Sequence, residues 1–330
     1  MPNLGSPSFA EALLTDTSVP DAMQRVTEHA CAPGAGGLPL VSVIVPVYND
    51  SNELEALLRA LADQDFPAER FECLVIDNAS ERPLVVPTGF TFFLRVLHES
   101  RPGSYAARNR GVCEARGEIL AFTDADCIPE RTWLSTAVLR ITTAERPIMV
   151  AGSLEVFLDD SISDSALGWH SVVNDLDQAR FLTEYRFAET ANMITTREVF
   201  DRVGEFNPAL YSGGDWEWGQ RAWASGIEQI YDPGVAVRHP ARADWKSLIG
   251  KTRRIAGGHY VFHRLTGRSW RATAATTLKI AASSLRRSWR DPRLPTVGRR
   301  MQVMLIDLVL RLIQFGEVLR LGLGGQPRRR

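Results

Sequence analysis

The apolar positions in residues 41–156 fall into two alternating patterns. Short runs rich in β-branched residues predict buried strands at residues 41–47, 71–76, 92–97, 118–123 and 148–156. Apolar residues at spacings of three and four predict helices between those runs, at residues 54–61, 104–116 and 130–143. Alternating strands and helices predict an α/β fold with a mostly parallel sheet flanked by helices. Ligands of such sheets bind beyond the carboxyl ends of the strands.

The pattern weakens between residues 161 and 189 and then resumes. A strand is expected from Ala191, followed by helices at residues 197–203 and 215–223 and a helical region after Trp245. The first 38 residues end in a Pro/Gly-rich linker composition, with a short helix expected near residues 9–14. The sequence therefore predicts three parts: a flexible segment (1–38), an α/β domain (39–244) and a basic helical extension (245–330).

Charge is divided unevenly between these parts. Residues 245–330 contain 19 Lys and Arg against three acids, a net charge of +16, whereas residues 1–244 carry 19 basic and 36 acidic residues, a net of −17. The sum is the −1 of the whole chain. Such asymmetry predicts a separate partner for the basic end.

One amphipathic helix is predicted near the C-terminus. Its apolar residues follow spacings of three and four and share one face: Met301, Met304, Leu305, Leu308, Leu312, Phe315 and Leu319. Arginines flank this helix on both sides, which favours contact with an anionic membrane surface. Packing of the apolar face on the α/β domain or on a second subunit is an open alternative. No nucleic-acid partner is expected.

The N-terminus lacks the pattern of a signal peptide, and no window of about 18 residues is free of charge, so no transmembrane helix is expected. The four cysteines show no C-x-x-C spacing and are interpreted as structural thiols. We expect a cytoplasmic protein, peripheral on the inner face of the membrane if the basic end binds lipid.

The strongest chemical signal is the triplet Asp124-Ala125-Asp126, which directly follows a predicted buried strand. Two other D-x-D triplets, at residues 63–65 and 175–177, lack that position. A turn at a strand end can aim two carboxylates at one point, and such hard oxygen ligands suit Mg²⁺ or Mn²⁺. An acidic turn that caps the next helix is the structural alternative.

Five motifs in order make the chain similar to the family 2 glycosyltransferases of the GT-A fold. They are Val43-Ile-Val-Pro-Val-Tyr-Asn49, Val75-Ile-Asp-Asn-Ala-Ser80, Gly103-Ser-Tyr-Ala-Ala-Arg-Asn-Arg-Gly111, Asp124-Ala-Asp126 and Gly213-Gly-Asp-Trp-Glu217. The resemblance spans residues 41–239. It implies a GT-A catalytic domain and metal-dependent, inverting transfer of a sugar from a nucleotide diphosphate sugar to a hydroxyl acceptor.

The resemblance also implies residue roles. The nucleotide-sugar site is expected to contain Pro46, Tyr48, Asp77, Arg108, Asn109, Asp124 and Ala125. The metal, Mn²⁺ or Mg²⁺, is expected on Asp126 and Asp124, with His239 as a further ligand. A UDP-sugar is the expected donor, with GDP and dTDP left open.

For the acceptor side, the family pattern places Glu-Asp at positions 214 and 215. Here the first acid is Gly214, which leaves Asp215 as the expected catalytic base and Glu217 as the second choice. Trp216 and Asn192 are expected near the acceptor, which is a saccharide, polysaccharide end or lipid-linked saccharide. The glycine expected before the Asn192 motif is Thr190 in this chain.

Competing functions lack their own signatures. A nicotinamide dehydrogenase would need G-x-G-x-x-G after the first strand, and a P-loop kinase its Walker motif. A sugar-nucleotide pyrophosphorylase would need a lysine near the first strand, yet no lysine precedes Lys246. A degenerate transferase-like binding module at a membrane surface is the non-enzymatic alternative.

Overall fold

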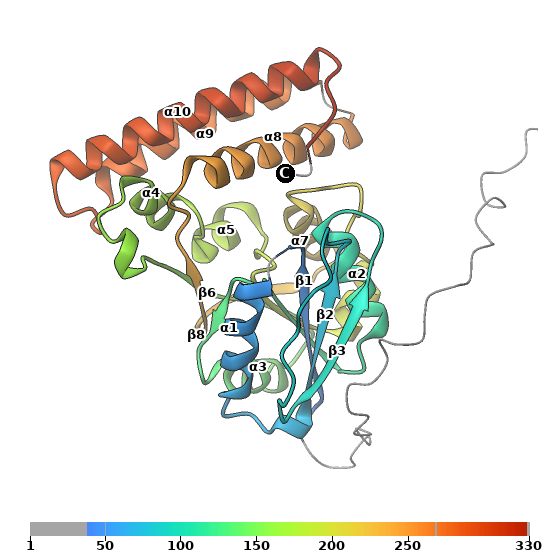
Figure 1. Cartoon of the computed structure of the whole chain (residues 1–330). Helices are drawn as coiled ribbons and strands as arrows, with labels where there is room; N and C mark the ends of the chain where they lie inside the picture. Colours follow the sequence, from blue (N-terminus) through green and yellow to red (C-terminus); the bar gives the residue numbers. More distant parts are fainter. Residues whose placement is uncertain (1–37, 50, 268, 329–330) are drawn as a thin grey trace, which may run out of the picture.

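The computed structural model describes residues 38–49, 51–267 and 269–328, and these are built around one sheet (Figure 1). Its eight strands in the described residues have the order β3-β2-β1-β4-β7-β6-β8-β5. Their bounds are β1 Val41–Val47, β2 Phe71–Asp77, β3 Phe93–His98, β4 Ile119–Thr123, β5 Ile128–Pro129, β6 Ile148–Phe157, β7 Asn192–Thr196 and β8 Glu228–Pro240.

The first four strands of that order run parallel, as the alternating pattern predicts. Strand β7 then pairs antiparallel with both β4 and β6, β8 runs parallel to β6, and the short β5 closes the edge antiparallel to β8. The prediction of a mostly parallel sheet flanked by helices is confirmed.

Both faces of the sheet are buried by helices. On β1, Val43 and Val45 point to the face covered by α1 (Ser51–Ala62) and α3 (Trp133–Thr142). Ile44 points to the other face, covered by α2 (Ser104–Glu114), α6 (Arg197–Val203) and α7 (Gly214–Ala224). This double coverage explains why the β1 sequence is a continuous apolar run.

Two helices occupy the stretch where the sequence pattern was weak. Helix α4 (Ala166–Asn174) and helix α5 (Gln178–Tyr185) begin where the side chains of Ser165 and Asp177 accept hydrogen bonds from backbone N–H groups of the first turn. Short 3₁₀ turns lie at Ala68–Arg70 and Asp160–Ile162. The helix expected near residues 9–14 lies outside the described residues.

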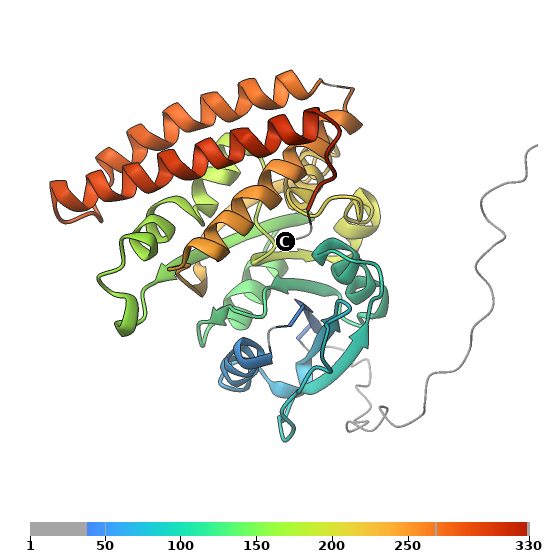
Figure 2. The same cartoon turned by 45° about the horizontal axis from the view of Figure 1, so that its top comes forward.

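The last three helices form a layer beyond the carboxyl ends of the strands (Figures 1 and 2). They are α8 (Trp245–Leu265), α9 (Trp270–Arg290) and α10 (Val297–Gly322), and α10 packs against α8, α9 and α4. Within the described ranges, no helix combines the length and apolarity that crossing a bilayer requires. Whether residues 39–244 fold as a domain without this layer stays a prediction.

Candidate functional site

A cavity of about 580 Å³ lies between the carboxyl ends of the strands and the layer of C-terminal helices. Its walls come from the ends of β1 and β4, the first turns of α2 and α7, and the inner sides of α4, α8, α9 and α10. The predicted residues that line it are Pro46, Tyr48, Arg108, Asp124, Ala125, Asp126, Asp215, Trp216 and His239. Residues from five segments that are separate in the sequence therefore meet in one space.

The first feature of this cavity is the ion pair between Arg108 of α2 and Asp124 at the end of β4. The Arg108 side chain lines the cavity and is only 3% exposed. Its guanidinium also lies 5.5 Å from the centre of the Tyr105 ring. The pair fixes Asp124 in place while leaving over a third of its side chain open to the cavity.

The second feature is the contact between Asp126 and His239, whose Nε2 lies 3.3 Å from a carboxylate oxygen of Asp126. His239 Nδ1 donates to the carbonyl of Pro240 at 2.7 Å, because a carbonyl can only accept. Nε2 is then the nitrogen without a proton in a neutral ring, and it faces a second acceptor. A proton or a bound cation satisfies both groups.

This arrangement fits a divalent metal. Neighbouring ligands on an octahedral ion with bonds of about 2.1 Å are about 3 Å apart, close to the separation of Asp126 and His239. Burial would raise the pKa of Asp126, but His239 and then Arg242 outweigh it and hold that pKa below its usual range. No group of three or more His, Cys, Asp or Glu in the described part of the chain is arranged for a metal. Further ligands would have to come from a bound substrate.

The third feature is Asp215 in the first turn of α7. Its carboxylate accepts hydrogen bonds from the hydroxyl of Tyr105 at 3.0 Å and from the backbone N–H of Trp216 at 2.9 Å. Burial raises the pKa of Asp215 despite these bonds and despite the nearby Arg108. A buried carboxylate with a raised pKa is a better proton acceptor than an exposed one.

The glycine before Asp215 has a structural cause. A Cβ at Gly214 would lie 2.7 Å from the ring of Tyr105, so no larger residue fits beside that ring. The preceding Gly213 has φ of +77°, which favours glycine. The acid expected at position 214 is thus excluded by the same tyrosine that holds Asp215.

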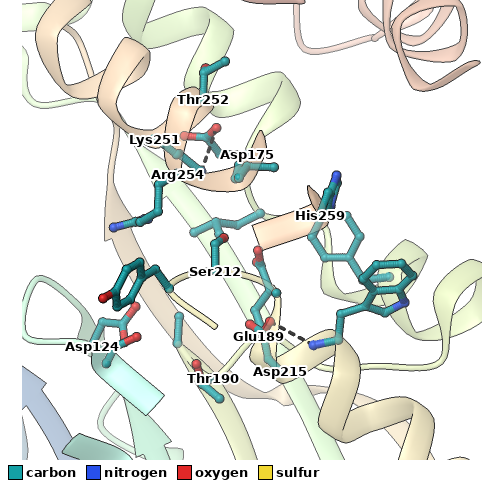
Figure 3. A pocket seen from close by; sticks show the side chains of 18 of the residues that line it. Asp124, Asp175, Glu189, Thr190, Ser212, Asp215, Lys251, Thr252, Arg254 and His259 are labelled. Carbon is teal, nitrogen blue, oxygen red and sulfur yellow. Dashed lines mark hydrogen bonds and ion pairs between the residues drawn. The ribbon is translucent and has the colours of Figure 1, made fainter. Parts of the chain in front are cut away.

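Sequence reasoning missed a cluster of charged residues in the upper part of the cavity (Figure 3). Lys251 of α8 lies 2.9 Å from Asp175, which Arg242 also approaches at 3.5 Å. Burial raises the pKa of Glu189 to about 8, and its Oε2 has no hydrogen-bond partner among the described residues. The scarcity of lysine, three in the chain, was the one sequence signal that pointed to Lys251.

The aromatic residues of α7 are divided between cavity and core. Trp216 lines the cavity and packs against Phe262 of α8, with ring centres 4.5 Å apart. Trp218 is fully buried in the core and donates to the carbonyl of Gly204. Trp223 is 48% exposed. Of these three tryptophans only Trp216 lines the cavity, because successive positions of α7 point in different directions.

Several predicted residues do not line the cavity. The amide of Asn109 bonds the backbone of Phe206 in both directions. Glu217 pairs with Arg221 at 2.7 Å. Asp77 accepts from the N–H of Ser80 at 3.0 Å and lies 3.4 Å from His98, so its contact with a base stays a prediction.

Asn192 has a role different from the one expected. It is fully buried and accepts from the indole of Trp133, while its amide donates to the carbonyls of Ser153 and Val235. These bonds tie β7 to α3, β6 and β8. The side chain is used inside the protein and does not reach the acceptor side of the cavity.

Comparisons with known proteins agree with this geometry. A family model described as Glycosyl transferase family 2 matches residues 42–204. Glycosyltransferase AglE of Haloferax volcanii is 32% identical over 253 residues, which are 75% of this chain and 82% of that protein. The pre-mycofactocin glycosyltransferase of Mycobacterium tuberculosis is 23% identical over 64% of this chain, and the match spans 45% of that longer protein.

Among solved structures, the chain is similar to the mannosyltransferase PcManGT of Pyrobaculum calidifontis, a complex with GDP-Man and Mn²⁺. The TM-score is 0.56 at 18% sequence identity, and the match covers 89% of each chain. At that identity the likeness shows the fold, so the expected GT-A-type architecture is confirmed.

The role of Asn192 generates a stability prediction. Asn192→Ala leaves the Trp133 indole and two buried carbonyls without partners, so we expect a loss of unfolding free energy on the order of 3 kcal/mol. Urea unfolding measures it, with Gln302→Ala, an exposed polar residue, as the control. An Asn192→Ala protein as stable as the wild type but defective in turnover would restore the acceptor role.

Proposed function

Since this chain belongs to glycosyl transferase family 2 and is a transferase enzyme, we propose that it moves a sugar from a nucleotide diphosphate sugar to an acceptor hydroxyl, with inversion and with a divalent metal. The observation that carries this proposal is the convergence of the Asp126–His239 pair, Asp124 and Asp215 on one cavity. One end of the cavity can hold a metal ion together with the diphosphate of the donor, and the other end presents the catalytic base.

The donor side is formed by residues at the ends of β1 and β4. Pro46 and Tyr48 offer apolar and aromatic surface for the nucleobase of the donor, and Asp77 at the end of β2 remains our candidate for a hydrogen bond to that nucleobase. We assign Asp124 to the ribose and the metal region. The Pyrobaculum complex with GDP-Man makes a guanosine nucleotide the main competitor of the expected UDP-sugar.

The metal would be held by Asp126 and His239, with Asp124 nearby and the diphosphate completing its coordination. Mg²⁺ usually binds through one or two carboxylates plus substrate phosphates, and a neutral imidazole also suits Mn²⁺. When bound, the ion would neutralise the negative charge that develops on the departing diphosphate.

The chain's own contribution to bond making comes from Asp215. As the acceptor oxygen attacks the anomeric carbon, its proton passes to the Asp215 carboxylate and the bond from that carbon to the diphosphate oxygen breaks. The Tyr105 hydroxyl holds the carboxylate in position. Trp216 and His259 form part of the wall beside it; burial lowers the pKa of His259 to about 4, so the ring is neutral and polar without adding charge.

The two alternatives to a transferase, a degenerate binding module and a pyrophosphorylase, account for fewer of the features of this cavity. A degenerate binding module would have no need of a buried base beside a metal-ligand pair. A pyrophosphorylase would need a cation beside the leaving phosphates near β1, whereas Lys251, the lysine that lines the cavity, comes from α8 and is paired with Asp175.

The metal assignment predicts that transfer stops in EDTA and returns on addition of Mn²⁺ or Mg²⁺. Asp126→Ala should abolish transfer in any metal, because the ion loses its carboxylate ligand. Asp63→Ala, in a D-x-D triplet outside the cavity, is the control and should keep full activity. Product formation from a panel of sugar nucleotides measures both, and full activity in EDTA contradicts the assignment.

The base assignment predicts that Asp215→Asn lowers kcat by roughly 100-fold or more while donor binding changes little. Glu217→Gln is the matched control, since Glu217 lies two residues further along the same helix and pairs with Arg221. The reverse result, a crippled Glu217→Gln and an active Asp215→Asn, would show that the base is misassigned.

The pH dependence of kcat follows from the environment of Asp215. Its pKa is raised by burial, so activity should fall as the pH drops through a value above that of an ordinary aspartate. The Tyr105 hydroxyl stabilises the charged carboxylate, so Tyr105→Phe should raise the pKa further and move the acidic limb to higher pH. A limb that stays in place or moves to lower pH argues against Asp215 as the titrating base.

A further inference from the structure

Helix α10 buries three polar side chains among its apolar contacts with the protein and leaves a second set of apolar side chains open to solvent. Asp307, Gln314 and Glu317 are at most 5% exposed, whereas Met301, Leu305 and Leu312 are each more than 60% exposed. The side open to solvent carries no charged residue among those classed as exposed between residues 297 and 322: Val297, Gly298, Met301, Gln302, Leu305, Leu308, Leu312, Gly316 and Leu319. A helix on the surface of a globular protein normally shows the opposite arrangement.

The apolar stripe predicted from the sequence is therefore present and mostly open to solvent, although Phe315 packs against the cluster of Ala256, Ala274 and Val318. The alternative that it packs on the α/β domain is wrong, because α10 meets α4 and α8 through a different set of residues, among them Val303, Ile306 and Leu310. The buried polar side has partners of its own: Asp307 approaches His170 at 3.5 Å and Arg311 at 3.3 Å. These contacts keep Asp307 on the inner side of α10, and the apolar stripe therefore faces solvent.

The neighbouring helix α9 presents a different surface beside this stripe. Its exposed charged residues are all basic: Arg271, Lys279, Arg286 and Arg290. They share one side of the helix with Leu278 and Trp289, which are 58% and 44% exposed. Helices α9 and α10 pack side by side (Figure 2), so an apolar strip and a basic strip lie next to each other.

No acid interrupts this combined surface. The three acids of residues 245–330 are Asp291, Asp307 and Glu317; all are at most 7% exposed and each pairs with an arginine. Some basic residues of this segment pair with acids elsewhere in the chain, Lys251 with Asp175 and Arg299 with Asp164, so the positive charge of this surface comes mainly from the exposed basic residues of α9.

We propose that the exposed sides of α9 and α10, together called the outer face, dock on an anionic lipid surface with both helices lying in its plane. Apolar side chains would enter the boundary between headgroups and acyl chains, while the α9 basic residues contact the headgroups. A second copy of the chain fits less well, because a symmetric contact would bring two basic strips to one interface.

The outer face also bears on the substrate. The inner sides of the same helices line the cavity through residues such as Thr276, Arg287 and Gln314. A single layer of helices would separate the cavity from the membrane. This arrangement favours a lipid-linked acceptor. That conclusion rests on the proposed transfer reaction, whereas the proposal that the outer face docks on lipid does not.

The test is co-sedimentation of the full chain with vesicles, which needs no substrate. We expect binding to phosphatidylcholine vesicles containing phosphatidylglycerol to exceed binding to pure phosphatidylcholine by at least about tenfold at low salt, and to weaken at high salt. Absence of binding to the anionic vesicles at low salt overturns the proposal.

Variants locate the contact. The double change Leu305→Asp and Leu312→Asp should abolish binding, because both side chains lie in the apolar strip. Leu139→Asp is the matched control, since Leu139 is 62% exposed on α3, at the other end of the molecule (Figure 1). Binding by the double variant equal to that of the control overturns the assignment to the outer face.

Two further measurements cover the cases in which the double variant folds poorly or the outer face binds a second copy of the chain. The first applies if the double variant folds poorly, and it uses vesicles with brominated acyl chains. These vesicles should quench part of the tryptophan emission of the wild type, and Trp289→Phe should remove part of that quenching. Absence of quenching in the wild type contradicts docking. Light scattering that shows a dimer dissolved by Leu305→Asp, with no vesicle binding, would assign the outer face to self-association instead.

Discussion

The rest of this structure depends on how six carboxyl groups are accommodated around one cavity: Asp124, Asp126, Asp175, Glu189, Asp215 and Asp307. A carboxylate close to other carboxylates is destabilised by burial and by repulsion, and the surroundings of these groups offset this destabilisation in different ways. Arg108 pairs with Asp124, His239 with Asp126, and Lys251 with Asp175. Glu189 instead has a pKa raised to about 8, and burial raises the pKa of Asp215 as well. The outcome is a cavity whose charged and proton-accepting ends are distinct, which is what transfer of a sugar from a diphosphate to a hydroxyl requires.

The helical layer is part of that solution rather than an appendage. Lys251 and His259 reach the cavity from α8, and α10 contributes polar residues to its far wall. The inner side of α10 uses polar residues for the cavity and Val303, Ile306 and Leu310 for its contacts with α4 and α8, while a second set of apolar residues, among them Leu305 and Leu312, is left on the outside. One amphipathic helix thus links the polar interior of the site to the outer face.

Most of the sheet and its helices could be predicted because β1, β2 and β4 are largely apolar runs, interrupted only by Ser42 in β1 and Glu72 in β2, and the helices between them have regular spacing. The strand-end positions of Asp124 and Asp126 followed from the same pattern. Helices α4 and α5 were missed because their residues divide between the cavity and several neighbours, which blurs a single apolar face. Asn192 and Asn109 were misplaced, since a motif gives the position of an amide but not whether its hydrogen bonds point to a substrate or to the backbone. Likewise, spacing located the apolar side of α10, but only packing shows which side of a helix faces the protein.

The claim that depends most directly on the cavity is that metal and nucleotide bind together at Asp126 and His239. Thermal unfolding of the wild type with Mn²⁺ alone, with a nucleoside diphosphate alone and with both measures this coupling. We predict that the shift with both ligands exceeds the sum of the separate shifts, and that His239→Ala removes the excess. Equal stabilisation by the nucleotide in Mn²⁺ and in EDTA would contradict the account.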